Sequence, residues 1–262
     1  MFTSNPFAEL SSFIAPAIMQ TFVVVMIVLV VGGTLIDVVH KGSARYFFNN
    51  WRKVKAKGET SVGGGQMISI AVKTAAVDVL TSGEFCNPMR RIAHLLGMYG
   101  FVAYVVATIV MVFSYPTPAT PTPEIWPILW HIGALMVCLG GYWFWLFIRV
   151  DVASEGHSRF RLVHADLFIL SLLASVTFAL IWAYLQYRGI DIWANLFLGL
   201  YLLATVILFG GIPWSKFSHM FFKPAAAMQK RAETANGSRR GLPPPADAPE
   251  QFGSGRRQPQ NY

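Results

Sequence analysis

The chain has 262 residues, of which 54% are hydrophobic and only 13% are charged, and its formal net charge is +8. Soluble domains carry about 25% charged residues spread over their surface, so this composition excludes an ordinary soluble domain. Several apolar runs of about 20 residues instead predict membrane-spanning helices. The basic residues lie between and beyond those runs, which the positive-inside rule explains without a nucleic-acid partner.

We predict an all-α integral membrane protein with five transmembrane helices. A short external segment, residues 1–14, precedes them and contains no lysine or arginine. A cleaved signal peptide needs a basic n-region, so we expect the first apolar run to remain as an anchor. The predicted spans are residues 15–36, 92–113, 128–148, 162–184 and 193–212.

The link between the first two spans, residues 37–91, contains a second kind of helix. Apolar or small residues recur on one side of a helix over residues 66–80, which predicts an amphipathic helix against the membrane or a partner. A helix that is only solvated is the alternative. The residues of this side are Met67, Ile70, Ala71, Thr74, Val77 and Leu80. The five spans and this link make up a membrane domain over 15–224. Residues 225–262 lack apolar periodicity, which predicts a disordered cytoplasmic tail.

The distribution of lysine and arginine predicts the orientation. The link 40–93 holds nine of them, the link 149–163 holds three and residues 213–262 hold eight, whereas Arg188 alone lies on the opposite side. Positive charge marks the cytoplasmic side, so we expect the N-terminus outside and the C-terminus in the cytoplasm.

Histidines near the cytoplasmic ends of three spans form the candidate site. His94 opens the second span, His164 opens the fourth and His219 follows the fifth. Ionisable groups in membrane spans are costly and are therefore functional candidates. Two neutral imidazoles from facing helices can ligate one haem iron, so we expect a haem with His219 as one ligand and His94 or His164 as the other.

Neighbouring residues fit a haem of this kind. Arg90, Arg91 and Arg149 lie at the same depth and could pair with the propionates. Gly97 and Gly100 remove side-chain bulk where the macrocycle would pack, although such glycines also let helices approach closely.

His131 begins the third span on the outer side, about 25 Å from the inner edge at 1.5 Å per residue. It is too distant to share an iron with His94 or His219, and the outer half holds no second histidine. An outer bis-histidine haem is therefore excluded. His131 either donates a hydrogen bond to a quinone head group or anchors the interface beside Trp126 and Trp130.

Two motifs carry a resemblance to a known family. Arg-Ile-Ala-His94-Leu-Leu-Gly-Met-Tyr-Gly-Phe opens the second span, and Pro-Trp-Ser-Lys-Phe-Ser-His219-Met-Phe-Phe closes the fifth. With five spans, they resemble the gamma subunit of respiratory nitrate reductase and its relatives in sulfur metabolism. Glu84-Phe-Cys-Asn-Pro-Met-Arg-Arg and the overall length are most similar to the membrane anchor of adenylylsulfate (APS) reductase.

The resemblance implies a b-type cytochrome of the inner membrane that exchanges electrons between quinone and a cytoplasmic iron–sulfur or flavoprotein oxidoreductase. It favours His94 over His164 as the partner of His219. Two-haem members carry further histidines where this chain has Tyr104 and Tyr201, so the resemblance also implies one haem b, on the inner side.

We therefore expect an electron-transfer subunit without catalysis of its own, with quinone as the membrane substrate. The alternative is a haem-free membrane tether for a soluble complex. A small transporter is disfavoured, because the sequence shows no inverted repeat of broken helices and no charge in the middle of a span.

Overall fold

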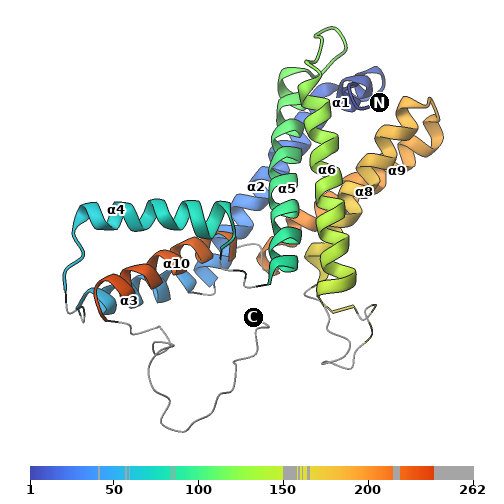
Figure 1. Ribbon diagram of the computed structural model, residues 1–262. Coiled ribbons are helices and arrows are strands. Elements are labelled where there is room, and N and C mark those ends of the chain that lie inside the picture. Colours follow the sequence, from blue (N-terminus) through green and yellow to red (C-terminus); the bar gives the residue numbers. More distant parts are fainter. Residues whose placement is uncertain are drawn as a thin grey trace. The chain divides into compact units, whose positions relative to one another are not determined.

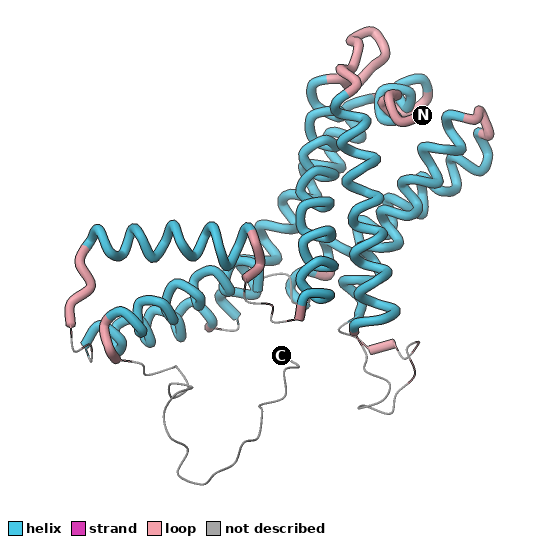
Figure 2. Tube along the Cα trace, in the orientation of Figure 1, coloured by secondary structure: helices cyan, strands magenta, loops and turns pink. Residues whose placement is uncertain are grey.

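The computed structural model describes residues 1–40, 42–56, 58, 60–83, 85, 87–149, 158, 160, 162–163, 166–214 and 219–238. These residues form helices joined by turns and loops, with no strand among them (Figure 2). Five helices in this part of the chain are long and apolar enough to cross a membrane. This confirms the predicted all-helical class and indicates a multi-pass membrane protein.

The five long helices coincide with the predicted spans, with boundaries shifted by a few residues. The fourth begins five residues later than predicted, and the second begins four residues earlier. The helices are α2 (Pro16–His40), α5 (Pro88–Ser114), α6 (Ile125–Trp143) with its π-helical extension η3 (Phe144–Ile148), α8 (Leu167–Tyr187) and α9 (Asp191–Gly210).

The chain divides into two compact units. The first comprises residues 1–37 and 92–218, and the second comprises residues 38–91 and 219–262. The first unit also contains α1 (Pro6–Glu9) and the 3₁₀ turns η1 (Leu10–Ser12) and η5 (Ile212–Trp214). The second contains α3 (Ser43–Ala56), α4 (Gly64–Lys73), its π-helical extension η2 (Thr74–Leu80) and α10 (His219–Ala235) (Figure 1).

The helices of the first unit pack through small residues and a few polar contacts. The Gln20 amide of α2 donates to the Val112 carbonyl of α5 at 3.3 Å. Tyr142 of α6 and Thr177 of α8 share a hydrogen bond of 2.9 Å between their hydroxyls. Small residues at helix interfaces let backbones approach closely, which is how apolar helices associate where water does not drive them together.

A tight turn joins α8 to α9. Gly189 has a φ of +68°, which a residue without a Cβ adopts at little cost. The Gly189 N–H donates to the Gln186 carbonyl and the Ile190 N–H donates to the Leu185 carbonyl, both at 3.0 Å. This pair of bonds is a Schellman motif. It turns the chain so that α9 packs alongside α8 (Figure 1).

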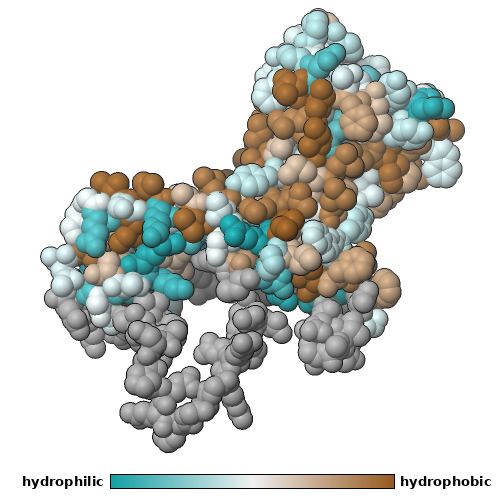
Figure 3. Space-filling view, viewed as in Figure 1, coloured by the Kyte–Doolittle hydropathy of each residue, from teal (hydrophilic) through white to brown (hydrophobic). Residues whose placement is uncertain are grey.

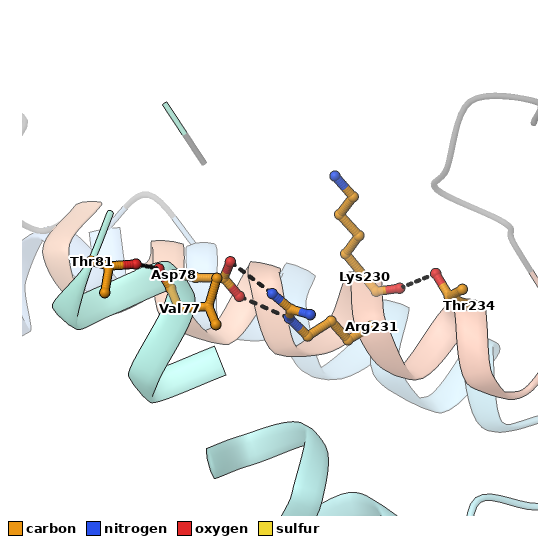
Figure 4. A network of polar contacts seen from close by, with 6 residues as sticks. All are labelled: Val77, Asp78, Thr81, Lys230, Arg231 and Thr234. Carbon is orange, nitrogen blue, oxygen red and sulfur yellow. Dashed lines mark hydrogen bonds and ion pairs between the residues drawn. The ribbon is translucent and has the colours of Figure 1, made fainter. Parts of the chain in front are cut away.

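In the second unit, α10 packs against both α3 and the α4–η2 segment. The Arg231 guanidinium of α10 donates to both carboxylate oxygens of Asp78 in η2, at 2.8 and 2.9 Å (Figure 4). The Asn236 amide donates to the Val54 carbonyl of α3 at 3.2 Å. These contacts hold the three helices together.

This packing changes two predictions for the second unit. The sequence placed a disordered tail from residue 225, whereas residues 225–235 are helical and only residues 239–262 of the tail lie outside the described part. The periodic face of residues 66–80 has an internal partner, because Thr74 is buried and the segment packs on α10. The buried residues of α10, Ala227, Gln229, Ala232 and Glu233, and Asn236 directly after it are small or polar and show no apolar periodicity.

Candidate functional site

His94 lies on the second turn of α5, in the first unit, and its side chain is exposed. The start of the helix is well defined, because the Asn87 carboxamide oxygen accepts the backbone N–H groups of Met89 and Arg90, at 2.9 and 3.4 Å, and Pro88 occupies the first position. The helix therefore places His94 near its N-terminus.

The two predicted glycines differ in their surroundings. A Cβ placed on Gly97 would meet no atom within 4 Å outside its own helix. Residues three apart on a helix share a face, so this open space lies next to His94. A Cβ on Gly100 would lie 2.7 Å from the Gly133 carbonyl oxygen and 2.9 Å from the Val137 nitrogen of α6. Gly97 therefore leaves open space beside His94, whereas Gly100 serves the packing of α5 on α6.

The glycine contact continues along both helices. A Cβ on Gly133 would lie 2.7 Å from the Tyr104 nitrogen, and a Cβ on Gly140 would lie 2.6 Å from the Ala93 carbonyl oxygen. Three glycines, Gly100, Gly133 and Gly140, thus let the backbones of α5 and α6 touch over about two helical turns.

The predicted propionate partners have different environments. Arg149 forms an ion pair with Asp166, and its guanidinium lies over the Trp145 ring at 5.4 Å. The Asp166 carboxylate also accepts the Val163 N–H at 3.0 Å. This pair joins the end of α6 to the start of α8 and was not predicted. In the sequence, Asp166 stands directly before an apolar run, but nothing there identifies Arg149 as its partner.

Arg91 belongs to the second unit, where its Nε–H donates to the Thr81 carbonyl at 2.7 Å. His219 is the first residue of α10 in the same unit, and its side chain is not described. His164, the alternative ligand, lies outside the described residues. Among the described residues, no group of three or more His, Cys, Asp or Glu side chains could hold a metal ion. A haem held by two histidines does not require such a group.

An aromatic core occupies the part of the first unit that contains Tyr104 and Tyr201. Tyr104 of α5 stacks on Trp130 of α6 with 5.2 Å between ring centroids, and Tyr201 of α9 stacks on Trp182 of α8 with 5.8 Å. Trp130 is 0% exposed and Trp182 is 1% exposed, and both tyrosines are buried. Side chains therefore fill the region around Tyr104 and Tyr201.

Phe7 of α1 completes this aromatic core. Its ring lies 5.8 Å from Trp130 and 5.3 Å from Trp182 between centroids. Asn5 holds the segment in place, because its carboxamide oxygen caps α1 and its Nδ2 donates to the Tyr115 carbonyl and to Thr122 Oγ1, both at 3.0 Å. We predicted only a short external segment here. An asparagine followed by proline is a helix-start signal that indicates α1.

His131 lies beside this core and is fully buried. Its Nδ1 is 2.7 Å from the Pro127 carbonyl oxygen, which can only accept, so Nδ1 carries the proton. The neutral ring then presents Nε2 as an acceptor, and Nε2 has no hydrogen-bond partner among the described residues. In this tautomer His131 does not donate to a quinone carbonyl. Contacts with Phe2 and Trp130, at 5.0 and 4.9 Å between centroids, fit a packing role.

No protein-family model matches the chain, and neither does any curated protein or any solved structure.

Proposed function

We propose that the protein is a membrane-bound electron-transfer subunit that binds one haem b through His94 and His219. The partners would be membrane quinone and a cytoplasmic iron–sulfur or flavoprotein oxidoreductase, for which the resembled family suggests APS reductase of dissimilatory sulfur metabolism. Haem bound in this way would supply a one-electron relay at a single iron.

The main support for this proposal is the difference between the surroundings of Gly97 and those of Tyr104 and Tyr201. The space beside Gly97, one turn from His94, is open, whereas Tyr104 and Tyr201 are buried in a closed aromatic core. An exposed imidazole next to an open helix face is suited to a ligand of planar shape. The filled aromatic core has no room for a second planar ligand, because protein interiors are close-packed.

The chain's own residues would divide the remaining tasks. His94 and His219 would supply neutral imidazole nitrogens to the iron, and Gly97 would leave one face of α5 free for the macrocycle. We assign Arg90, Arg91 and Arg149 to the propionates; of these, Arg149 also pairs with Asp166 and Arg91 also donates to the Thr81 carbonyl. The aromatic core and the α5–α6 glycine contact make the interior of the helix bundle close-packed.

Charge supports an orientation with the N-terminus outside and the C-terminus in the cytoplasm, in the inner membrane of a cell. Twenty of the 21 lysine and arginine residues lie in segments that this orientation places on the cytoplasmic side. Unit two would then face the soluble partner. Its two described acidic residues are engaged inside the unit, Asp78 with Arg231 and Glu233 with Gln229. Its surface therefore favours an acidic partner.

A single cofactor near the cytoplasmic side has a consequence for energy conversion. Electrons would not cross the membrane through this subunit, so quinone would react in the inner half and release no protons outside. Turnover in sealed vesicles should then generate no membrane potential, and a potential produced by this protein would contradict the single-site proposal.

Optical spectra of the purified full-length protein test the proposal. Reduction should give a b-type spectrum that His94→Ala and His219→Ala each abolish. His40→Ala is the matched control, because His40 is exposed at the end of α2 and has no role in the proposed site. A colourless wild-type protein would overturn the proposal and leave the haem-free tether. If the b-type spectrum persists in His94→Ala but is lost in His164→Ala, His164 is the second haem ligand in place of His94.

A further inference from the structure

Helix α4 carries three different faces around its axis. At 100° per residue, Met67, Ile70, Ala71 and Thr74 share one face, and Gln66, Ser69 and Lys73 share a second. Ile68, Val72 and Ala75 share the third, which we call the outer stripe. The first face packs on a neighbouring helix and the second, which is polar, contacts water. The outer stripe has neither role.

The first face is used inside the second unit. Thr74 is buried, Met67, Ile70 and Ala71 are half-buried, and the segment packs on α10. The Asp78–Arg231 pair fixes the rotation of η2 against α10 (Figure 4). The outer stripe is therefore turned away from α10, and the stability of the unit does not require it.

The outer stripe is apolar and exposed. Ile68 is 67% exposed and Val72 is 63% exposed, and Leu80 of η2 extends the apolar surface. Figure 3 shows apolar side chains gathered along α4 beside hydrophilic ones. A contiguous exposed apolar patch on a helix marks a surface that contacts another phase or molecule.

Charge and connectivity indicate what covers this stripe. Residues 64–73 contain no acidic side chain, exposed Lys73 lies on the neighbouring polar face, and Asp78 is neutralised by Arg231. The chain enters the second unit from α2 and leaves it into α5, which are both apolar enough to cross a membrane. The unit is therefore held at a bilayer. A helix with an apolar stripe and a lysine on the neighbouring polar face suits the headgroup layer of an anionic membrane.

We propose that α4 lies in the plane of the membrane surface, with Ile68 and Val72 of the outer stripe inserted among the lipid acyl chains. The first-face residues Met67, Ile70 and Ala71 then bind α10, and Lys73 contacts anionic headgroups. This role does not depend on haem, so its test is separate from that of the proposed function.

Nitroxide labels on single cysteines test the proposal in the full-length protein. Cys86 and Cys138 are first replaced by serine, and cysteine is then introduced at residue 68 or 72, or at the control positions 69 and 73 on the polar face. The protein is reconstituted in vesicles of phosphatidylethanolamine and phosphatidylglycerol. Collision rates of each label with oxygen, which concentrates in lipid, and with a water-soluble nickel chelate are then measured.

Labels at 68 and 72 should collide at least several-fold more with oxygen than with the chelate, and labels at 69 and 73 should show the reverse ratio. Equal ratios at all four positions would overturn the proposal. So would labels at 68 and 72 that remain open to the chelate in vesicles and become protected only when the soluble fraction of the cell is added. That second result would assign the outer stripe to a protein partner.

Discussion

Replacing Gly100 and Gly97 separately by alanine tests the packing of α5 on α6. The two positions lie three residues apart on the same helix, so both substitutions gain the same helix propensity, about 1 kcal/mol. The two positions differ in the space around a Cβ atom. A Cβ on Gly100 would lie 2.7 Å from the Gly133 carbonyl oxygen, whereas a Cβ on Gly97 would meet nothing within 4 Å.

The difference between the two variants isolates the steric cost. Backbone atoms of α6 are not the movable end of a side chain, so α5 and α6 must separate to admit the methyl group at residue 100. Overpacking of this kind costs about 1–3 kcal/mol. We therefore expect the free energy of unfolding of Gly100→Ala to lie about 1–3 kcal/mol below that of Gly97→Ala.

The free energy can be measured for protein in mixed detergent micelles by titration with sodium dodecyl sulfate, followed by circular dichroism. Both variants should be prepared without haem, so that cofactor affinity does not contribute to the difference. Equal stability of Gly97→Ala and Gly100→Ala, within about 0.5 kcal/mol, would refute the close backbone contact, since distinct sites without strain differ by little more than this. Gly133→Ala, on the facing helix, should repeat the loss.

Three further variants test other parts of the structure. Phe7→Ala removes a buried ring between two tryptophans and should lower the free energy of unfolding by about 3–5 kcal/mol, measured by the same titration. Asp78→Asn removes the charged partner of Arg231 and should cost about 1–3 kcal/mol, measured as faster limited proteolysis of the second unit. The double variant Tyr104→His/Tyr201→His should still bind one haem per chain, measured by haem-to-protein ratio, because tryptophans fill the space around both positions.

Each of these has its own control and contrary result. Phe13→Ala should leave the free energy of unfolding nearly unchanged, because Phe13 is 57% exposed. An equal loss of stability in Phe7→Ala and Phe13→Ala would contradict the burial of Phe7 in the core. Lys230→Ala, next to Arg231 and exposed, should leave proteolysis unchanged. Proteolysis as fast in Lys230→Ala as in Asp78→Asn would contradict the ion pair. A haem ratio near two in the double histidine variant would show that the aromatic core is not closed.

The sequence was sufficient to predict the five long helices, because each is a nearly continuous apolar run and lipid leaves a chain few alternatives to a helix. It was not sufficient for α10. Its buried residues include Gln229 and Glu233, which share a hydrogen bond, and Asn236 directly after the helix donates to Val54 of α3. Periodicity of hydrophobic residues does not detect such a face.

The sequence suggested residue types for the candidate site but not the contacts that those residues make. Gly97 and Gly100 look alike in sequence, and only the neighbouring helix distinguishes an open face from a backbone contact. In the same way, nothing local to Arg149 indicates that Asp166, 17 residues later, will pair with it. The periodic apolar side of residues 66–80 was expected to face the membrane or a partner. In the structure this side packs on α10, and a different apolar face of the helix is exposed.

The haem-to-protein ratio of the purified full-length chain tests the central claim most directly. A pyridine haemochrome assay, with protein measured by amino-acid analysis, should give one haem b per chain, and none in His94→Ala or His219→Ala. A ratio near two would contradict the assignment of a single site and the closed aromatic core around Tyr104 and Tyr201. A ratio of zero in the wild-type protein would contradict the electron-transfer function itself.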